Sequence, residues 1–509
     1  MSFILYFRPY EVFILSILAF GFLFWGCHDQ TDISEDTNKN PLFTLLPASE
    51  TGIDFNNQLT ESLNTNVLMY EYFYNGGGVA IGDLNGDNLE DIYFTANMTD
   101  NKLYLNKGNL TFDDITEKSK VKGRPGPWKT GTTLVDINGD NKLDIFVCYS
   151  GKVAGEKRIP QLFINQGNTN DSIPIFKDEA SAYGLRDSTY CTQAYFFDYD
   201  RDGDLDMLQL NHNPTRIGNI NDARIRRLMA QKDNQKGTRL FQNTDNRFVD
   251  VSAKSGIINS ILNYNLSAAV SDVNNDGWPD IYIANDYLVP DYLYINNQDG
   301  TFTDSLGESM GHTSQFSMGN DAADINNDGF TDIVSLDMLP EDNRRQKLLF
   351  APDNYEEFDM FVRSGFHRQY MRNMLQLNNG NGTFSEIGQL SGISNTDWSW
   401  SALAADYDND GWKDIYVTNG YLRDYTNMDF LKYMTGYLQQ KGSSVYRKDL
   451  FDLVQKIPAS NVVNYIFKNK NGFQFENMQA PWGITQPSNS NGAASVSYTH
   501  LTLPTIYSV

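Results

Sequence analysis

The chain has 509 residues, too many for one small hydrophobic core, which indicates several domains or one large repeat assembly. Its formal net charge of −24 argues against nucleic acid or an anionic membrane surface as a partner. An aromatic content of 13% is too high for an acidic disordered chain, so we expect a folded protein.

The N-terminal residues have the features of an export signal. An apolar run over residues 12–25, too short for a comfortable membrane span, ends in Gly26-Cys27. This ending resembles a bacterial lipobox, so we expect residues 1–27 to be a signal, Cys27 to carry a lipid, and residues 28–41 to form an acidic tether. An uncleaved signal anchor is the alternative. Either arrangement predicts an exported protein, an outer-membrane or cell-surface lipoprotein that contacts the membrane only through its anchor.

Six short motifs rich in aspartate recur along the chain, and we number them first to sixth. Each places oxygen donors at relative positions 1, 3 and 5 and an aspartate at position 9, which is the ligand order of a calcium loop. An EF-hand is excluded because the glutamate at position 12 and the flanking helices are missing. The predicted Ca²⁺ ligands are Asp83, Asn85, Asp87 and Asp91; Asp136, Asn138, Asp140 and Asp144; Asp198, Asp200, Asp202 and Asp206; Asp272, Asn274, Asp276 and Asp280; Asp324, Asn326, Asp328 and Asp332; and Asp406, Asp408, Asp410 and Asp414.

About six bound Ca²⁺ ions would halve the negative charge of the chain, and their loss would leave like charges held together. Calcium is therefore expected to contribute strongly to stability. Asparagine replaces aspartate at position 3 in four of the loops, which predicts modest affinity.

Each loop joins two strand-like runs, A and B, and two further runs, C and D, follow. Lys102–Asn106 and Thr111–Asp114 are one such C–D pair. Four-stranded units repeated at this period predict the blades of a β-propeller. The spacing between loops varies, so the additional residues must lie in insertions.

The repeated pattern, an apolar run followed by Gly/Ala-x-Asp-x-Asn-x-Asp-Gly-x-x-Asp-Ile-x-Val, resembles FG-GAP/VCBS repeats. Together with Asp337–Pro340 and Asn419–Arg423, it resembles the exported VCBS-repeat proteins of Bacteroidetes, which are related to the cartilage acidic protein group. The resemblance covers roughly Leu42 to Ala494. It implies an all-β fold, a seven-bladed propeller like that of integrin α-subunit heads, with bound calcium. It implies no established reaction.

Three long insertions, roughly Asn211–Thr238, Asp337–Arg372 and Asn419–Asn464, follow strand B and should emerge on the face opposite the calcium loops. They are expected to be partly helical, with a short basic helix at Asp222–Met229. An aromatic residue precedes each A strand on that same face. These side chains could pack the insertions onto the propeller, or they could line a funnel that binds a glycan or a protein. The candidate ligand-binding residues are Trp128, Tyr190, Tyr264, Trp398 and Trp400.

Catalysis has little support, since neither HExxH nor GxSxG occurs. His312 and His367 lie in loops of the predicted funnel, so a polysaccharide lyase or hydrolase on the same propeller is the alternative. We expect a calcium-dependent binding or adhesion module rather than an enzyme. Cys148 and Cys191 are either two small buried side chains or a disulfide between neighbouring blades.

The C-terminal part of the chain departs from the repeat. Residues 464–494 predict strands C and D of the sixth unit and the beginning of a further strand A. Residues 495–509 match no repeat and are interpreted as a non-native tail, which would leave the chain truncated inside a seventh blade. An outer strand at Leu42–Pro47 is expected to pair with that blade.

Overall fold

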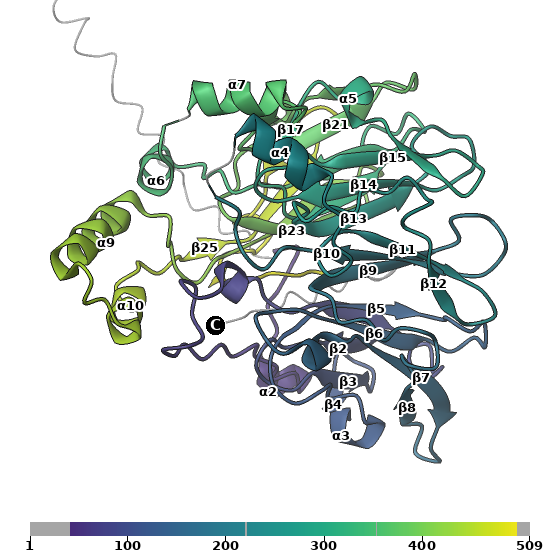
Figure 1. Cartoon of the computed structure of the whole chain (residues 1–509). Helices are drawn as coiled ribbons and strands as arrows, with labels where there is room; N and C mark the ends of the chain where they lie inside the picture. The colour runs from purple at the N-terminus through teal and green to yellow at the C-terminus, as the bar shows by residue number, and fades with distance from the viewer. Residues whose placement is uncertain (1–40, 219–220, 353, 496–509) are drawn as a thin grey trace, which may run out of the picture. The chain divides into compact units, whose positions relative to one another are not determined.

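The computed structural model of the chain describes residues 41–495, except residues 219–220 and 353. The predicted signal with Cys27, the tether as far as residue 40, and residues 496–509 therefore lie outside the described residues. The described residues from Leu42 onward form one compact unit (Figure 1).

Six four-stranded antiparallel sheets follow one another in chain order. Each is a meander whose strands pair with their neighbours in sequence. The strands are β1 (Val79–Gly82), β2 (Asp91–Phe94), β3 (Lys102–Asn106) and β4 (Phe112–Asp114); β5 (Lys129–Val135), β6 (Asp144–Tyr149), β7 (Gln161–Asn168) and β8 (Pro174–Asp178); β9 (Cys191–Phe197), β10 (Asp206–Asn211), β11 (Arg239–Asn243) and β12 (Phe248–Asp250); β13 (Asn265–Ser271), β14 (Asp280–Asn285), β15 (Tyr292–Asn296) and β16 (Phe302–Asp304); β18 (Asn320–Ala323), β19 (Asp332–Ser335), β21 (Met374–Asn378) and β22 (Phe384–Glu386); and β23 (Ser399–Ala405), β24 (Asp414–Asn419), β26 (Tyr465–Asn469) and β27 (Phe475–Asn477).

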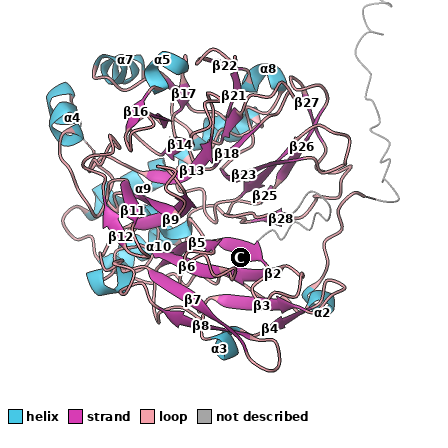
Figure 2. Cartoon of the chain, turned by 90° about the vertical axis from the view of Figure 1, so that its right-hand side faces the viewer, coloured by secondary structure: helices cyan, strands magenta, loops and turns pink. Residues whose placement is uncertain are grey.

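The second strand of each sheet is buried along its whole length, in β2 and β6 as in β10, β14, β19 and β24. Such strands are nearly continuous runs of apolar residues because neighbouring sheets cover both of their faces. The first strands also contact one another, since Thr130 Oγ1 donates to Cys191 O at 2.8 Å and Thr192 Oγ1 donates to Asn265 O at 2.9 Å. The sheets thus pack face to face around the molecule, an arrangement consistent with a β-propeller (Figure 2).

The remaining strands form two small two-stranded sheets. β17 (Thr313–Ser314) pairs in parallel with β20 (Gln369–Tyr370), and β25 (Val462–Val463) pairs with β28 (Pro487–Ser488). After β28, Ser490 N donates to Asn419 O at 2.8 Å and Asn491 Nδ2 donates to Tyr74 O at 3.2 Å. The segment expected to begin a further strand A therefore lies between the sixth sheet and the start of the first. The described part of the chain holds six four-stranded sheets, and the predicted seventh, truncated blade is not confirmed.

The predicted outer strand at Leu42–Pro47 is not formed. Its backbone makes one hydrogen bond to the sixth sheet unit, from Phe43 N to Trp482 O at 2.9 Å, and the single-turn helix α2 (Ala48–Thr51) follows. A strand needs a ladder of such bonds, and this segment has only one. The side chain of Phe43 holds the segment in place instead. The Phe43 ring packs edge-on against Tyr407 and Trp482, with ring centroids 6.0 and 6.3 Å apart.

The longer helices lie in the three insertions, as the sequence predicts, and gather on one side of the sheets (Figure 1). α4 (Asp222–Met229) lies between β10 and β11, α6 (Asn343–Leu349) and α7 (Tyr355–Arg363) lie between β19 and β21, and α9 (Met428–Lys441) and α10 (Arg447–Val454) lie between β24 and β26. The single-turn elements are η1 (Glu71–Tyr74), α3 (Thr116–Ser119), η2 (Gly155–Arg158), α5 (Leu306–Ser309) and α8 (Gly388–Ser391). Among the described residues, no helix has both the length and the apolar character that a membrane crossing requires.

The two cysteines of the sheets lie in neighbouring units, Cys148 in β6 and Cys191 in β9. Both are fully buried free thiols, and their sulfur atoms are 2.8 Å apart. Neither of the two sequence interpretations, small buried side chains or a linked pair, is excluded by this placement.

Candidate calcium loops and ligand pocket

All six predicted calcium loops adopt one closed turn between strands A and B. The carboxylate at position 1 accepts backbone hydrogen bonds from positions 5 and 6; in the sixth loop, Asp406 accepts from Asp410 N at 3.0 Å and from Gly411 N at 2.9 Å. Positions 4 and 6 have positive φ, with values of 59° at Asn409 and 93° at Gly411. Asparagine takes position 6 in the first two loops, because it tolerates the left-handed conformation better than other side chains do.

The aspartate at position 9 begins strand B and is fully buried in every unit. One of its oxygens accepts from the backbone N–H at position 2, and the other accepts from the backbone N–H of an asparagine in strand C. This asparagine is the last residue of strand C in every unit except the second, where β7 continues beyond Asn165. In the fifth unit these bonds to Asp332 come from Ile325 N at 2.9 Å and Asn378 N at 2.8 Å. The same two bonds recur in the other five units. This aspartate therefore ties the loop to strands B and C of its own sheet.

This strand C asparagine also connects neighbouring sheets, a role that our reading of the sequence missed. Asn378 Nδ2 donates to Thr331 O in its own loop at 3.2 Å and to Val273 O in the preceding loop at 2.7 Å. Equivalent bonds to the preceding loop are made by three further asparagines, Asn165, Asn296 and Asn469. The available signal was the recurrence of an asparagine after the apolar run of every strand C.

The third and sixth loops carry aspartate at position 3 and have the donor set that suits calcium. The carboxylates of Asp198, Asp200 and Asp206 offer oxygens within 4.8 Å of one another, as do those of the sixth loop, Asp406, Asp408 and Asp414. Asp200 Oδ1 and Asp408 Oδ1 are buried and lack a hydrogen-bond partner within the described part of the chain. Converging carboxylate oxygens with an unused acceptor fit a hard divalent cation.

In the first, fourth and fifth loops, the asparagine at position 3 turns its amide toward position 5. Asn85 Nδ2 donates to Asp87 Oδ2 at 3.0 Å, and Asn274 and Asn326 make the same bond. The side-chain oxygen of Asn85 accepts from Asp87 N at 3.1 Å. In these loops the amide offers one donor oxygen in place of a carboxylate, which lowers the negative charge around a cation.

Burial makes the position 9 carboxylates difficult to ionise without a cation. It raises the pKa of Asp206 to about 8 and that of Asp414 to about 7, against the opposing backbone hydrogen bonds, and neighbouring aspartates add to the effect. A divalent ion would supply the compensating positive charge. The electrostatics of the loops therefore favour an ion-bound form.

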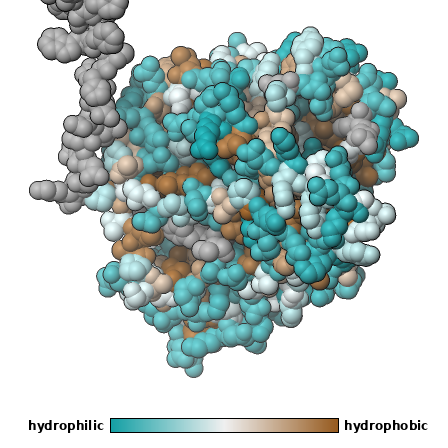
Figure 3. All heavy atoms as spheres, turned by 90° about the vertical axis from the view of Figure 1, so that its left-hand side faces the viewer, coloured by the Kyte–Doolittle hydropathy of each residue, from teal (hydrophilic) through white to brown (hydrophobic). Residues whose placement is uncertain are grey.

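The opposite face, which carries the insertions, contains a cavity of about 890 Å³. Figure 3 shows apolar atoms gathered across the middle of this face. The insertions of the fifth and sixth units and η1 contribute most of the walls, and aromatic and methionine side chains dominate them. The lining includes Tyr72, Tyr287, Phe316, Met318, Met338, Tyr355, Phe358, Met371, Trp398, Trp400, Tyr421, Tyr425 and Met428.

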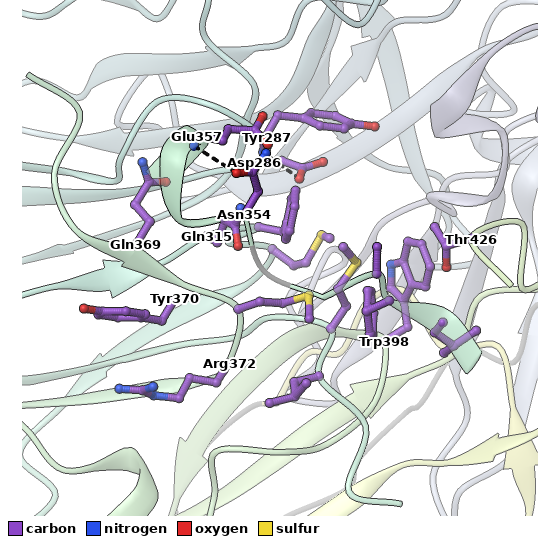
Figure 4. A pocket seen from close by; sticks show the side chains of 18 of the residues that line it. Asp286, Tyr287, Gln315, Asn354, Glu357, Gln369, Tyr370, Arg372, Trp398 and Thr426 are labelled. Carbon is purple, nitrogen blue, oxygen red and sulfur yellow. Dashed lines mark hydrogen bonds between the residues drawn. The ribbon is translucent and has the colours of Figure 1, made fainter. Parts of the chain in front are cut away.

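Polar side chains stand at separate edges of this pocket (Figure 4). Asp286, Gln315 and Glu357 lie at one end, Tyr370 and Arg372 at another, and Trp398 with Thr426 at a third. Most of these polar groups are separated by apolar side chains. The arrangement can hold a ligand by apolar contact and orient it with a few hydrogen bonds.

Asp286 is the most deeply buried acid of the pocket. Its carboxylate accepts from Tyr72 OH at 2.9 Å and from Tyr287 N at 2.8 Å. Burial nevertheless raises the pKa of Asp286 to about 7. The Tyr287 hydroxyl donates to Glu71 at 2.9 Å, and the guanidinium of Arg216 lies 5.4 Å from the Tyr287 ring centre. This end of the pocket is therefore acidic and aromatic, with one cation above it.

Part of the predicted open funnel is filled by the chain itself. Tyr70, Tyr72 and Phe73 join the largest buried cluster on this face, which also contains Trp128 and Tyr264. The latter two side chains are only 4% and 1% exposed, because the N-terminal segment packs over the ends of the sheets. At these two positions the structure shows packing rather than an open surface.

The remaining predicted aromatics have different surroundings. Trp398 and Trp400 line the pocket and stack on Tyr421, with ring centroids 4.2 and 6.1 Å away. Tyr190 is half-buried and lies under the guanidinium of Arg158 at 4.0 Å. Of the five candidates, the structure brings only the two tryptophans together at the pocket.

The two loop histidines are held by protein groups. His367 lines the pocket and its Nε2 lies 2.8 Å from Met310 O, so this nitrogen donates to the carbonyl. Burial lowers the pKa of His367. His312 Nε2 lies 3.2 Å from Glu386 and 3.1 Å from Arg372. Each histidine thus has a structural partner in the described part of the chain.

The fold and loops define a class of protein, an all-β repeat protein of four-stranded units joined by aspartate-rich loops. A family profile described as FG-GAP-like repeat matches residues 83–147, 136–208, 272–335 and 358–417. The chain belongs to the FG-GAP repeat proteins. Among curated proteins, no sequence matches it significantly.

Several solved structures are similar to parts of this chain at low sequence identity. A lectin of Agrocybe aegerita, described as recognising non-reducing terminal N-acetylglucosamine, is 15% identical with a TM-score of 0.41, covering 80% of this chain and 83% of that chain. A rhamnogalacturonan lyase of Bacillus licheniformis is 10% identical with a TM-score of 0.28, covering 67% and 69%. The V. cholerae biofilm matrix protein Bap1 is 10% identical with a TM-score of 0.29, covering 68% and 48%. At these values, the likeness assigns no function to this chain.

Proposed function

We propose that this FG-GAP repeat protein is a calcium-stabilised, seven-bladed propeller that binds a glycan or protein ligand in the pocket on its insertion face. The observation that carries the proposal is the cavity of about 890 Å³, which is built by insertions on a rigid array of sheets. Its mostly apolar and aromatic lining, with a few separated polar groups, has the character of a ligand site.

In this proposal the calcium loops belong to the scaffold that presents the pocket. They lie at the A–B turns, whereas the pocket lies among the B–C insertions on the other face. About six Ca²⁺ ions, held by the six predicted ligand sets, would neutralise buried carboxylates that join strands A, B and C. The ions would stabilise the sheets that present the pocket without touching the ligand.

The partners of two titratable groups of the pocket support recognition rather than turnover. His367 is engaged with a backbone carbonyl, and Asp286 accepts two protein hydrogen bonds. A polysaccharide lyase or hydrolase would need a free general acid or base at the substrate. In our proposal the protein is exported and anchored by a lipid on Cys27, which would present the pocket to ligands outside the cell.

The proposal is tested with a matched pair of exposed tyrosines on insertion helices. Tyr355 on α7 is 76% exposed and lines the pocket, whereas Tyr446, which precedes α10, is 71% exposed and belongs to no part of the pocket lining. Glycan-array and protein pull-down binding should fall at least ~tenfold in Tyr355→Ala and remain unchanged in Tyr446→Ala.

The Trp398→Ala variant extends the test to the pocket interior. It should also lose binding, with its folding checked by circular dichroism in excess calcium. Equal binding by the wild type, Tyr355→Ala and Trp398→Ala would place recognition elsewhere. Turnover of a polysaccharide that His367→Ala abolishes would replace the proposal with the enzymatic alternative.

A further inference from the structure

The residue immediately before this strand C asparagine divides the six units into two groups. In four units it is apolar, namely Leu105, Ile164, Ile295 and Leu377. In the third and sixth units it is polar, namely Gln242 and Lys468. These are the two units whose loops carry aspartate rather than asparagine at position 3, so the two positions vary together along the chain.

The structure shows why they vary together. Gln242 Nε2 donates to Asp200 Oδ2 at 2.7 Å. The Lys468 ammonium forms an ion pair with Asp408, the equivalent residue of the sixth loop, and lies 2.8 Å from Asp410 Oδ2. In each case the side chain on strand C reaches the position 3 carboxylate of its own loop.

Lys468 is well placed to act as a cation of the sixth loop. Its side chain is 22% exposed, and those of Asp408 and Asp410 are 18% and 33% exposed, so the pair is shielded from bulk water more than most surface ion pairs. A lysine side chain is an ammonium at neutral pH, so these contacts place a full positive charge beside the two aspartates. The ammonium contacts two of the carboxylates that are expected to bind calcium.

The charges of the two loops therefore differ. Each has four aspartates at the predicted ligand positions, one more than the loops with asparagine at position 3. Lys468 cancels one of these charges in the sixth loop. Gln242 is neutral and leaves the charge of the third loop intact.

We propose that Lys468 is an internal counterion of the sixth loop, which Ca²⁺ must displace, so that this loop binds calcium more weakly than its four aspartates imply and the third loop binds it most tightly. The inference rests on the proposed binding of calcium by these loops. It gives the propeller a graded response, in which the sixth unit takes up calcium at a higher concentration than the third.

Terbium luminescence in the full chain tests this inference. Trp412 occupies position 7 of the sixth loop and Trp278 occupies position 7 of the fourth, so each can sensitise a Tb³⁺ ion bound beside it. Tyr199 and Tyr407 stand at position 2 of the third and sixth loops, so the excitation wavelength is one that tryptophan absorbs and tyrosine does not. In a Trp278→Phe background, the sensitised signal then reports on the sixth loop, and additional Trp412→Phe should abolish it. Titration with Tb³⁺, followed by displacement with Ca²⁺, gives the affinity of this loop.

Lys468→Gln, which copies the residue of the third unit, should strengthen binding at the sixth loop by at least ~tenfold, because an ammonium in contact with the site is removed. Lys470→Gln is the matched control, since Lys470 lies on the same hairpin but pairs with Glu476. It should change the affinity less than about twofold. Lys468→Arg keeps the charge and should bind like the wild type.

The outcomes separate the inference from the proposed function. If no variant shows a signal that depends on Trp412, calcium does not bind at this loop and the proposed function loses its metal there. If the signal is present and Lys468→Gln binds like the wild type, or if Lys470→Gln matches its gain, the counterion role is overturned while calcium binding stands. In the reciprocal variant Gln242→Lys, one fewer tightly bound Ca²⁺ per chain should remain after dialysis at limiting calcium, and an unchanged count would contradict the role assigned to this position.

Discussion

Replacing Asn378 with alanine should weaken the junction between the fourth and fifth sheets. The Asn378 side chain is buried, and its amide nitrogen donates to Val273 O at 2.7 Å and to Thr331 O at 3.2 Å. Its oxygen accepts from Gly380 N at 3.0 Å. Alanine keeps the backbone bond to Asp332 but leaves both carbonyls without this donor. Because an unsatisfied buried polar group costs about 1–3 kcal/mol, and water can reach the Gly380 side of the turn, we expect a loss of about 3 kcal/mol in the free energy of unfolding.

The neighbouring Asn379 provides the control. It is exposed, and its amide donates to Thr383 Oγ1 at 3.0 Å within a single C–D turn. Asn379→Ala should therefore cost about 0.5 kcal/mol or less. Urea unfolding followed by far-ultraviolet circular dichroism, in saturating calcium, measures both variants. A loss below about 0.5 kcal/mol in Asn378→Ala, or an equal loss in Asn379→Ala, would refute the role assigned to this asparagine.

Three further predictions concern calcium, protons and thiols. Chelation of calcium should lower the melting temperature, since each ion held at a hundred times its dissociation constant contributes about 2.7 kcal/mol; a melting curve unchanged by chelator would contradict the stabilising role. Burial raises the pKa of Asp286 to about 7, so the folded protein holds a proton that the unfolded chain releases, and stability measured in saturating calcium should fall as pH rises from about 4 through about 7. Asp286→Asn should reduce this dependence by the share of one carboxyl, since burial also raises the pKa of Asp291 to about 7, and an unchanged slope in that variant would assign the dependence to other groups. Cys148 and Cys191, with sulfur atoms 2.8 Å apart, should form a disulfide by thiol–disulfide exchange with oxidised glutathione, each linkage releasing two reduced glutathione molecules. Because both thiols are fully buried, the exchange is run during refolding from urea; mass spectrometry should then find the two peptides linked, and two unlinked thiols would refute this.

The separation of the two faces has a consequence for all of these tests. The aspartate loops and the asparagines that join the sheets act at one end of the strands, and the pocket is built from insertions at the other end. Changes at the loops should therefore alter stability first and binding only through it. Changes at Tyr355 should alter binding with stability preserved, because this side chain is exposed.

The sequence by itself determined the features that depend on short segments. The loop ligands lie within nine residues of one another, so their spacing alone predicted the turn that closes on Asp406. The alternation of apolar runs and turns predicted the four-stranded units. The predicted helix at Asp222–Met229 is confirmed at the same bounds, because its apolar spacing and the Asn221 cap are both local.

The tertiary structure decided what depends on residues far apart in the chain. The contact of Lys468 with Asp408 and the bond from Asn378 to Val273 join side chains whose partners could not be read from spacing. The N-terminal aromatics, among them Tyr70, pack against Trp128 in the buried cluster on the insertion face. Burial of apolar area stabilises any segment that reaches this cluster, whatever its position in the chain. The same long-range packing removed the strand expected at Leu42–Pro47, which formed a single backbone bond in place of a ladder.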